Sequence, residues 1–267
     1  MAEHKGAIVG YALVLDMFWV EQSGSSFADI AVHPDHWGKG IGSRLYDQLL
    51  RVVQDSTAER LYAEVGDDRP QAQRFAAKRG FNETGHVERL SCLDVQKITL
   101  DGYDGLEERL RSEGVHITTL AELGPRDDHV LRAVHAVDMS TAKDVPSSEV
   151  FYLPFERWRD WLLTRPGVTP ESIFVALERD QPIGLATLGR EGRDSAWHRG
   201  TGVERAYRGR GIARLLKLRE IEWACQNGVD YLYTGNDVNN SRMYAINMRL
   251  GYRPLPGRIE MVKDLKA

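Results

Sequence analysis

Arg208-Gly209-Arg210-Gly211-Ile212-Ala213 is the stretch that decides the fold of the chain around it. It follows Gly202-Val203, which reads as the end of a strand, and it precedes a segment with apolar residues at 212, 215, 218, 221 and 224. This spacing places the apolar residues on one face of a helix. A glycine turn between strand and helix leaves backbone N–H groups unpaired at the helix N-terminus, where the helix dipole favours an anion. The motif therefore predicts a site for phosphate or pyrophosphate.

A second copy of this motif lies earlier in the chain. Trp37-Gly38-Lys39-Gly40-Ile41-Gly42 opens another amphipathic segment, with apolar residues at 41, 45, 49 and 53. Gly40 and Gly211 are 171 residues apart, and the same offset separates Gly80-Phe81 from Gly251-Tyr252. Because one register is kept over such a span, the sequence indicates a duplicated unit.

The two motifs resemble a known superfamily. Arg208-x-x-Gly211-x-Ala213 looks like the acetyl-CoA loop of the Gcn5-related N-acetyltransferases (GNAT), as does the segment from His33 to Gly42. The segment from Asn240 to Tyr252 resembles that superfamily's second conserved motif. The chain is similar to tandem members over nearly its whole length. The resemblance implies an α/β class, with a mixed sheet of α+β type that opens beside each glycine turn to admit the pantetheine arm.

The duplication also suggests unit boundaries. We expect a first unit at 1–96, a connector at 97–116 and a second unit at 117–267. Ile183 to Ala186 resembles Val9 to Ala12, so the second unit has about 65 residues ahead of this point where the first has 8. The opening strand and the two helices that usually wall the acceptor site are therefore expected to be missing from the first unit. We predict that the first unit is degenerate or mainly structural and that the second is catalytic.

The remaining elements follow from periodicity and from turn residues. Strands are expected at 7–20 (in two pieces), 26–32, 60–65, 86–95, 116–120, 172–178, 182–188, 195–203 and 231–234. Besides the helices after the glycine turns, helices are expected at 71–78, 102–113, 127–137, 155–163 and 241–249, with a loop at 138–154.

Composition narrows the class of protein. The chain is 42% hydrophobic and 28% charged, which is ordinary for a globular protein. Its net charge of −4 argues against a nucleic-acid partner. The apolar run at 7–20 contains Asp16 and is too short to span a membrane. Neither the eight histidines nor the two cysteines show metal-ligand spacing. We expect a cytoplasmic protein without a metal or a membrane partner, and a homodimer is left open.

The resemblance implies a set of residues that bind acetyl-CoA. Amides of the glycine turns would hold the pyrophosphate, basic side chains would add charge, the end of the preceding strand would polarise the thioester carbonyl, and an asparagine would contact the arm. The second unit supplies Val203, Arg208, Gly209, Arg210, Gly211, Ile212, Ala213 and Asn240, and the first supplies Val32, Trp37, Gly38, Lys39, Gly40, Ile41 and Gly42. The first unit departs from the pattern, with Trp37 where Arg or Gln is usual and Arg69 in place of the asparagine.

Acetyl transfer to an amine also needs groups that move protons. The tyrosine that usually protonates the departing thiolate is replaced by Asn247 in the second unit and by Ala76 in the first. The candidates that remain are Glu204, Tyr244, His198 and Asp237. We predict that Glu204 removes the ammonium proton and that Tyr244 or water protonates the thiolate.

Asp138 and Asp144, in the segment before the helix at 155–163, favour a small cationic amine as the acceptor. Loss of the acid tyrosine from both units also suits another class of protein, a non-catalytic acyl-CoA-binding or scaffolding protein. Thiol release from acetyl-CoA with a panel of amines separates the two. RNA binding by the Gly-Arg-Gly turns is disfavoured, because the net charge is negative and aromatic residues are not interleaved with basic ones.

Overall fold

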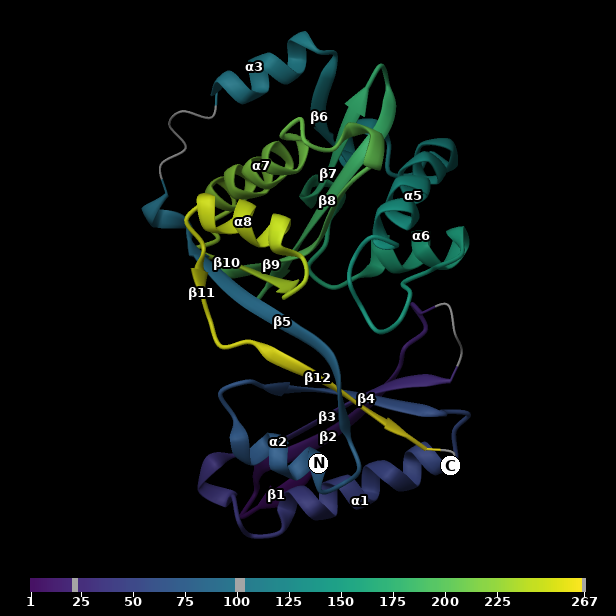
Figure 1. The fold of residues 1–267 in the computed structure, drawn as a ribbon, viewed down its shortest axis with the longest axis vertical. Coiled ribbons are helices and arrows are strands. Elements are labelled where there is room, and N and C mark those ends of the chain that lie inside the picture. Colours follow the sequence, from purple (N-terminus) through teal and green to yellow (C-terminus); the bar gives the residue numbers. More distant parts are fainter. Residues whose placement is uncertain (21–23, 99–103, 266–267) are drawn as a thin grey trace. The chain divides into compact units, whose positions relative to one another are not determined.

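The computed structural model describes residues 1–20, 24–98 and 104–265, and the chain forms two compact units (Figure 1). The first comprises Met1–Glu88, Ser148–Val150 and Pro256–Ala267, and the second comprises Arg89–Ser147 and Phe151–Leu255. These units do not follow the predicted boundaries at residues 96 and 117. The difference arises because two segments remote from residues 1–88 in the sequence pack with the first unit.

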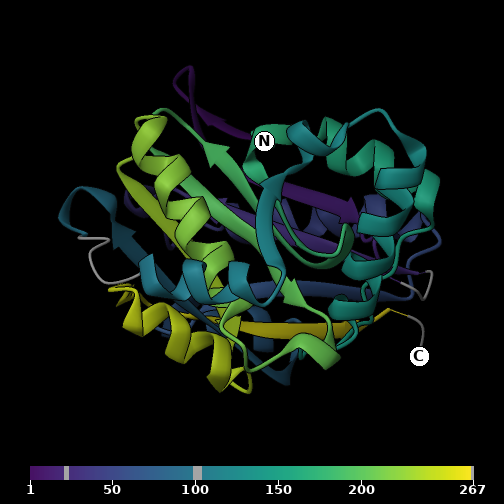
Figure 2. The same cartoon turned by 90° about the horizontal axis from the view of Figure 1, so that it is seen from above.

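The second unit is a mixed sheet with helices on both faces. Its elements are α3 (Asp104–Ser112), β6 (Val115–Thr119), α4 (Leu120–Leu123), α5 (Asp128–Ala142), α6 (Phe155–Thr164), β7 (Ile173–Glu178), β8 (Gln181–Glu191), β9 (Ser195–Val203), α7 (Ile212–Gln226), β10 (Tyr231–Asp237), α8 (Ser241–Arg249) and β11 (Arg253–Pro254). The strand order is β6-β7-β8-β9-β10, followed by the end of β5, with which β11 also pairs. Helices α7 and α8 lie on one face, and α5 and α6 lie on the other (Figures 1 and 2).

The first unit has a smaller sheet. It contains β1 (Ala2–His4), β2 (Ala7–Asp16), β3 (Ser25–Val32), α1 (Ile41–Gln54), β4 (Arg60–Gly66), α2 (Pro70–Ala77), the first part of β5 (Asn82–Asp94) and β12 (Arg258–Asp264). The strand order is β1-β2-β3-β4-β12-β5. The predicted apolar faces of α1 and α7 are both buried against their sheets, which explains why these segments form helices.

The last strand of the chain completes the first unit. β12 lies between β4 and β5 and is antiparallel to both. Met261 on β12 faces Ala63 on one side and Glu83 on the other, and its side chain is buried in the core under α1 and α2. No element was predicted beyond residue 249, so this strand and its place between β4 and β5 are new findings.

Three predicted elements differ from the structure. The run 7–20 contains one strand that ends at Asp16, where two pieces were expected. Helix α5 continues to Ala142, so the predicted loop at 138–154 begins at residue 143. The predicted helix at 102–113 is present as Asp104–Ser112, and residues 102–103 lie outside the described ranges.

Both sheets open at the same place. β3 pairs with β4 only over Ser25–Phe27, and β9 pairs with β10 only over Ser195–Trp197. Each pair is parallel, and each strand then continues without a partner on this side among the described residues. The openings lie beside the two glycine turns, as the family resemblance implied.

Candidate active site

The two glycine turns share one backbone conformation. Each follows the end of a strand and a 3-10 turn, Pro34–His36 in the first unit and Arg205–Tyr207 in the second. The φ angles are +74° and +76° at Gly38 and Gly40, and +82° and +94° at Gly209 and Gly211. Side chains rarely adopt this region, so the conformation requires glycine. Gly40 and Gly211 precede α1 and α7 without a side-chain cap, which leaves the first helical N–H groups for an anion.

The unusual Trp37 preserves a contact that closes the turn. Trp37 Nε1 donates a hydrogen bond to the carbonyl of Val32 at 2.6 Å. In the second unit, Arg208 Nε donates to the carbonyl of Val203 at 2.7 Å. These residues occupy equivalent positions in the duplication. The Trp37 indole therefore makes the hydrogen bond that the Arg208 guanidinium makes in the second unit. One N–H donor of Arg208 is used in this bond.

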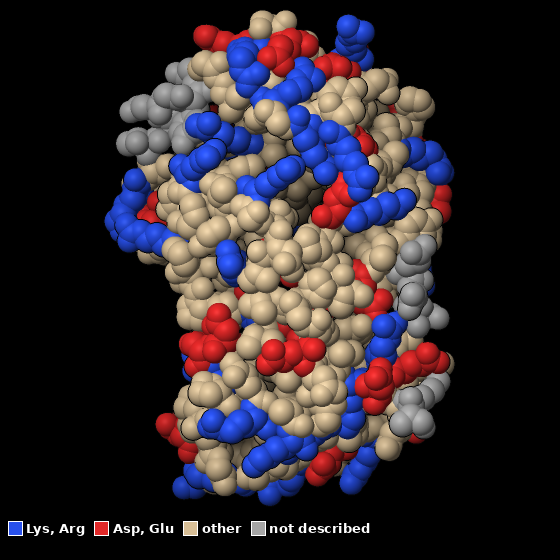
Figure 3. Space-filling view, in the orientation of Figure 1, with Lys and Arg blue, Asp and Glu red and all other residues tan. Residues whose placement is uncertain are grey.

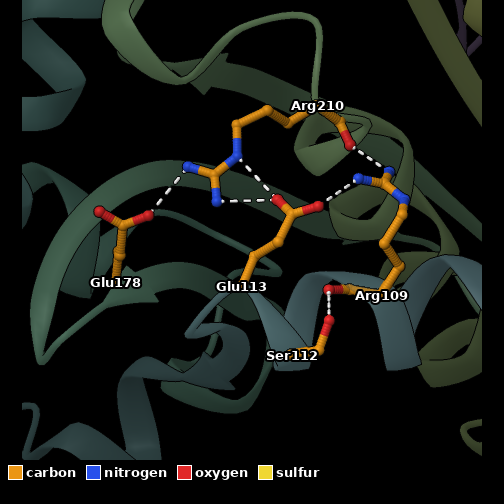
Figure 4. A network of polar contacts seen from close by, with 5 residues as sticks. All are labelled: Arg109, Ser112, Glu113, Glu178 and Arg210. Carbon is orange, nitrogen blue, oxygen red and sulfur yellow. Dashed lines mark hydrogen bonds and ion pairs between the residues drawn. The ribbon is translucent and has the colours of Figure 1, made fainter.

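The basic side chains of the second turn have acidic partners. Arg210 donates to Glu113 and, at 2.9 Å, to Glu178 at the end of β7, while Arg109 of α3 donates to the Arg210 carbonyl at 2.6 Å (Figure 4). A Cβ built on Gly211 would lie 2.8 Å from Leu106 of α3. Helix α3 therefore packs against one side of this turn. The role predicted for Arg210 in holding phosphate stays a prediction.

The carboxylates expected to attract a cationic acceptor are both engaged. Asp144 accepts hydrogen bonds from Arg205 and Arg208, which hold the pKa of its carboxyl far below the usual range. Asp138 is half-buried and accepts a hydrogen bond from Trp158 Nε1 at 2.7 Å, and desolvation of its carboxyl raises its pKa. The expectation that these residues hold a cationic amine therefore has no support in the geometry.

The turn of the first unit is less enclosed. Lys39 is exposed, and its Nζ donates to the carbonyl of Asp35 at 2.8 Å. A Cβ on Gly38 or Gly40 would meet nothing within 4 Å. Ile41 is buried, and Gly42 faces Phe75 of α2.

A β-bulge distinguishes the second unit from the first. β8 pairs Leu188 with His198 and Thr187 with Gly200, so Arg199 on β9 has no partner in the ladder. The equivalent pairing of β2 with β3 is regular. The bulge lies just beyond Trp197, where β9 parts from β10. A bulge turns backbone groups out of the ladder, which suits a strand that must offer an N–H group to a ligand.

The predicted base stands at the end of β9. Glu204 is half-buried, and its Oε2 accepts a hydrogen bond from Ser140 Oγ of α5 at 2.9 Å. Its backbone N–H donates to Ile183 on β8 at 2.9 Å. These two contacts fix the carboxylate between the sheet and a helix on the α5–α6 face. Position and accessibility suit a proton acceptor, and the role itself stays a prediction.

Several residues singled out in the sequence lie on or beside helix α8. The Asn240 side chain caps the helix by accepting from the Met243 N–H at 3.3 Å, and Asp237 accepts from the Asn239 N–H. Asn247 is fully buried and donates to Asn236 at 2.6 Å, so it cannot serve as an acid. The half-buried Tyr244 ring lies 5.1 Å from the guanidinium of Arg89. No hydrogen bond joins Tyr244 to Glu204 within the part of the chain that the structure describes.

A buried polar network under α7 was only partly foreseen. His198 Nδ1 lies 2.7 Å from Glu220, and its Nε2 contacts the hydroxyl of Tyr252. Lys217 lies with its Nζ 5.8 Å from the Tyr252 ring centroid and is fully buried, like Glu220. Burial lowers the pKa of Lys217 to about 8. The sequence signal for this network was Lys217 and Glu220, two opposite charges three residues apart beside the apolar face of α7.

This network predicts a dependence of stability on pH. The folded-state pKa of Lys217 lies below the ordinary 10.5, so burying its charge lowers the stability of the fold. This loss of stability is complete below pH 8 and shrinks as pH rises toward 10.5. We expect the stability difference between the wild type and Lys217→Met to change by about 2–3 kcal/mol between pH 7 and 10, as measured by denaturant unfolding. The exposed Lys143→Met is the control. A difference that stays constant with pH would show that the pKa of Lys217 is not lowered in the fold.

No helix in the described ranges is long and apolar enough to cross a membrane. No group of three or more His, Cys, Asp or Glu in the described ranges is placed to hold a metal ion. Basic and acidic side chains are interspersed on the face shown in Figure 3.

Comparison with known proteins agrees with this geometry. The profile of the Acetyltransferase (GNAT) family matches residues 1–81 and 134–252. The mycothiol acetyltransferase of Amycolatopsis mediterranei is 26% identical, over 93% of this chain and 78% of that protein. The mycothiol acetyltransferase of Nocardia farcinica is 24% identical, over 95% of this chain and 78% of that protein.

Solved structures share the fold. A GCN5-related N-acetyltransferase from Sphaerobacter thermophilus, 21% identical, has a TM-score of 0.74 and covers 98% of this chain and 78% of its own. A tandem GNAT protein from the clavulanic acid biosynthesis pathway, 18% identical, has a TM-score of 0.70 and covers 99% of this chain and 82% of its own. With the family profile matching most of its residues, the chain belongs to the acetyltransferase (GNAT) family.

Proposed function

We propose that this protein is an N-acyltransferase that moves the acetyl group of acetyl-CoA to a primary amine of a small molecule. The observation that carries the proposal is the turn from Arg208 to Ala213, with two glycines at positive φ and an uncapped helix behind it. That turn lies beside the point where β9 and β10 part. The likeness to two mycothiol acetyltransferases supports a small molecule as the acceptor.

We assign the reaction to the second unit. The bulge at Arg199 and the helices α5 and α6 belong to that unit, and the matching strand of the first unit is regular. The first unit retains the turn and the sheet opening beside it but has no equivalent of the bulge, so it would bind acetyl-CoA without acylating an amine, or serve the fold. Amides from Gly209 to Ala213 would face the pyrophosphate, with Arg208 beside them and an N–H of β9 near Val203 toward the thioester carbonyl.

When bound, acetyl-CoA would supply the acyl group as a thioester. The acceptor nitrogen forms the new C–N bond, the C–S bond breaks, and the sulfur leaves as a thiolate that gains a proton. Glu204 would take the ammonium proton before attack, directly or through water. Since the amide of Asn247 is buried and is not acidic, Tyr244 or water would protonate the thiolate.

Calorimetric titration with acetyl-CoA, combined with an assay of thiol release, tests this assignment. We expect Gly211→Glu to abolish both binding at the second unit and thiol release, because it adds a negative charge and a side chain at φ +94°. Gly40→Glu is the matched control, and it should leave thiol release intact. Activity that survives Gly211→Glu and vanishes with Gly40→Glu would assign catalysis to the first unit.

A second candidate function keeps one observation in its favour. Because Asn247 is buried against Asn236 and replaces the usual acid, the chain also suits a non-catalytic acyl-CoA-binding or scaffolding protein. Binding of acetyl-CoA without thiol release on any amine would establish this second function and exclude the first.

A further inference from the structure

The end of α5 lies against the last residues of β9 and the turn that follows them. Ser140 Oγ donates a hydrogen bond to Glu204 at 2.9 Å. Thr141 packs on the backbone of Gly202, where any side chain on the glycine would overlap it. Helix α5 ends at Ala142, so these contacts bring Asp144, two residues further on, to the second glycine turn.

Asp144 is shared by two arginines of this turn. Arg205 donates to it through Nε, at 3.0 Å from Oδ2, and through Nη2. Arg208 Nη2 donates to Oδ2 at 2.5 Å. The Asp144 side chain is only 16% exposed, and the two guanidinium groups hold the pKa of its carboxyl far below the usual range. One ionised carboxylate therefore acts as the counter-ion of both arginines.

The Arg208 guanidinium is fixed beside the N–H groups of the turn. Its Nε donates to the Val203 carbonyl at 2.7 Å, and the next residue, Gly209, already has the positive φ of the turn. A pyrophosphate held by the turn would therefore lie close to this guanidinium. Phosphate and carboxylate oxygens bind guanidinium groups through the same charge-assisted hydrogen bonds. A phosphate and Asp144 would then compete for Arg208.

The ion pairs of Asp144 are what chiefly attach residues 143–145 to the turn. Lys143 is exposed and Val145 is 54% exposed, so neither side chain buries much surface. The backbone closes a short turn at the end of α5, with the N–H of Asp144 on the carbonyl of Thr141 and that of Val145 on Ala142, both at 3.1 Å. Loss of the ion pairs should therefore loosen this segment.

We propose that Asp144 is an internal counter-ion for the arginines of the second turn, that the pyrophosphate of CoA displaces it, and that cofactor binding thereby releases residues 143–145. This inference rests on the proposed function, which makes the turn a site for CoA. Before binding, the carboxylate keeps the two guanidinium groups oriented. On binding, the phosphate takes over these bonds, and the need to break the ion pairs lowers the affinity. The first unit has Trp37 in place of Arg208, so its turn lacks this displacement.

Titration with CoA tests the displacement. The full chain is titrated calorimetrically, and we expect Asp144→Asn to bind CoA about fivefold more tightly than the wild type, because no ion pairs have to break first. A folding defect would change the affinity in the opposite direction. Asp144→Glu keeps the charge and should stay within about twofold of the wild type. Asp160→Asn removes a carboxylate from an arginine pair on α6, so it is the matched control and should not change the affinity.

Hydrogen exchange separates displacement of Asp144 from simple repulsion between its charge and the phosphates. In the wild type, saturating CoA should speed exchange at the amides of Asp144 and Val145 by about tenfold, because their bonds to the end of α5 loosen. In Asp144→Asn the same two amides should exchange quickly with or without CoA.

Four outcomes decide the inference. Equal or weaker binding of CoA by Asp144→Asn would overturn it and show that Asp144 orients the arginines toward the phosphate. Tighter binding with unchanged or slower exchange in the wild type would overturn the release of residues 143–145. No binding of CoA to either chain would overturn both this inference and the proposed function. Tighter binding and faster exchange, without thiol release on any amine, would support the displacement and count against the proposed function alone.

Discussion

A chain that ends at Leu255 is expected to lose the folded first unit while keeping the second. β12 supplies the strand between β4 and β5, and its removal leaves these two strands without a common partner. It also removes Met261 from the core under α1 and α2. A domain has a free energy of unfolding of only about 5–15 kcal/mol. The loss of a central strand costs more than this, so the truncated first unit should not stay folded. Hydrogen exchange should show β3 and β4 unprotected and α7 still protected.

Substitutions at one position provide the control for this truncation. Met261→Pro removes a ladder N–H in the middle of the sheet and should also release the first unit, whereas the similar-sized Met261→Leu should cost less than about 1.5 kcal/mol. A peptide of residues 256–265, added to the truncated chain, should restore protection of β4. Undiminished protection of β4 after truncation would mean that the first unit does not depend on β12.

Glu204→Gln is expected to lower kcat by roughly 10²–10⁴-fold and to leave the affinity for acetyl-CoA nearly unchanged. The amide keeps the shape of the side chain and its contact with Ser140, but it cannot accept the ammonium proton. Turnover is measured by thiol release and affinity by calorimetry. Ser140→Ala removes the hydrogen bond that orients the carboxylate and should have the smaller effect. A loss of less than about tenfold in Glu204→Gln would leave Glu204 as a turn residue, with proximity supplying the rate.

The sequence was most informative where structure is local. The glycine turns, the helices behind them and the strands before them follow from short-range spacing, and their duplication supplied an internal check. The site residues proposed within each turn come from the same short-range spacing, and their role in binding acetyl-CoA stays a prediction. Asn240 precedes α8, where its side chain caps the helix, and its contact with the cofactor arm stays a prediction.

Features that depend on contacts between residues far apart in the sequence could not be predicted. The sequence around Arg199 does not indicate a bulge, because a bulge depends on the register between two paired strands. Trp37 read as a departure from the family, and its hydrogen bond to Val32 becomes apparent only in three dimensions. The partners of Arg210 come from α3 and β7, at positions 113 and 178, so their approach could not be inferred from spacing along the chain.

The placement of β12 has a consequence for synthesis on the ribosome. Residues 1–88 are translated first, yet the strand that completes their sheet lies at Arg258–Asp264. At about 5–20 residues per second, roughly ten to thirty-five seconds pass between the two. During this time the nascent first unit exposes the edges that β12 will cover. When β12 is finally made, the second unit, which ends at Leu255, already has all its strands. The part of the chain that is made first is the last to finish folding.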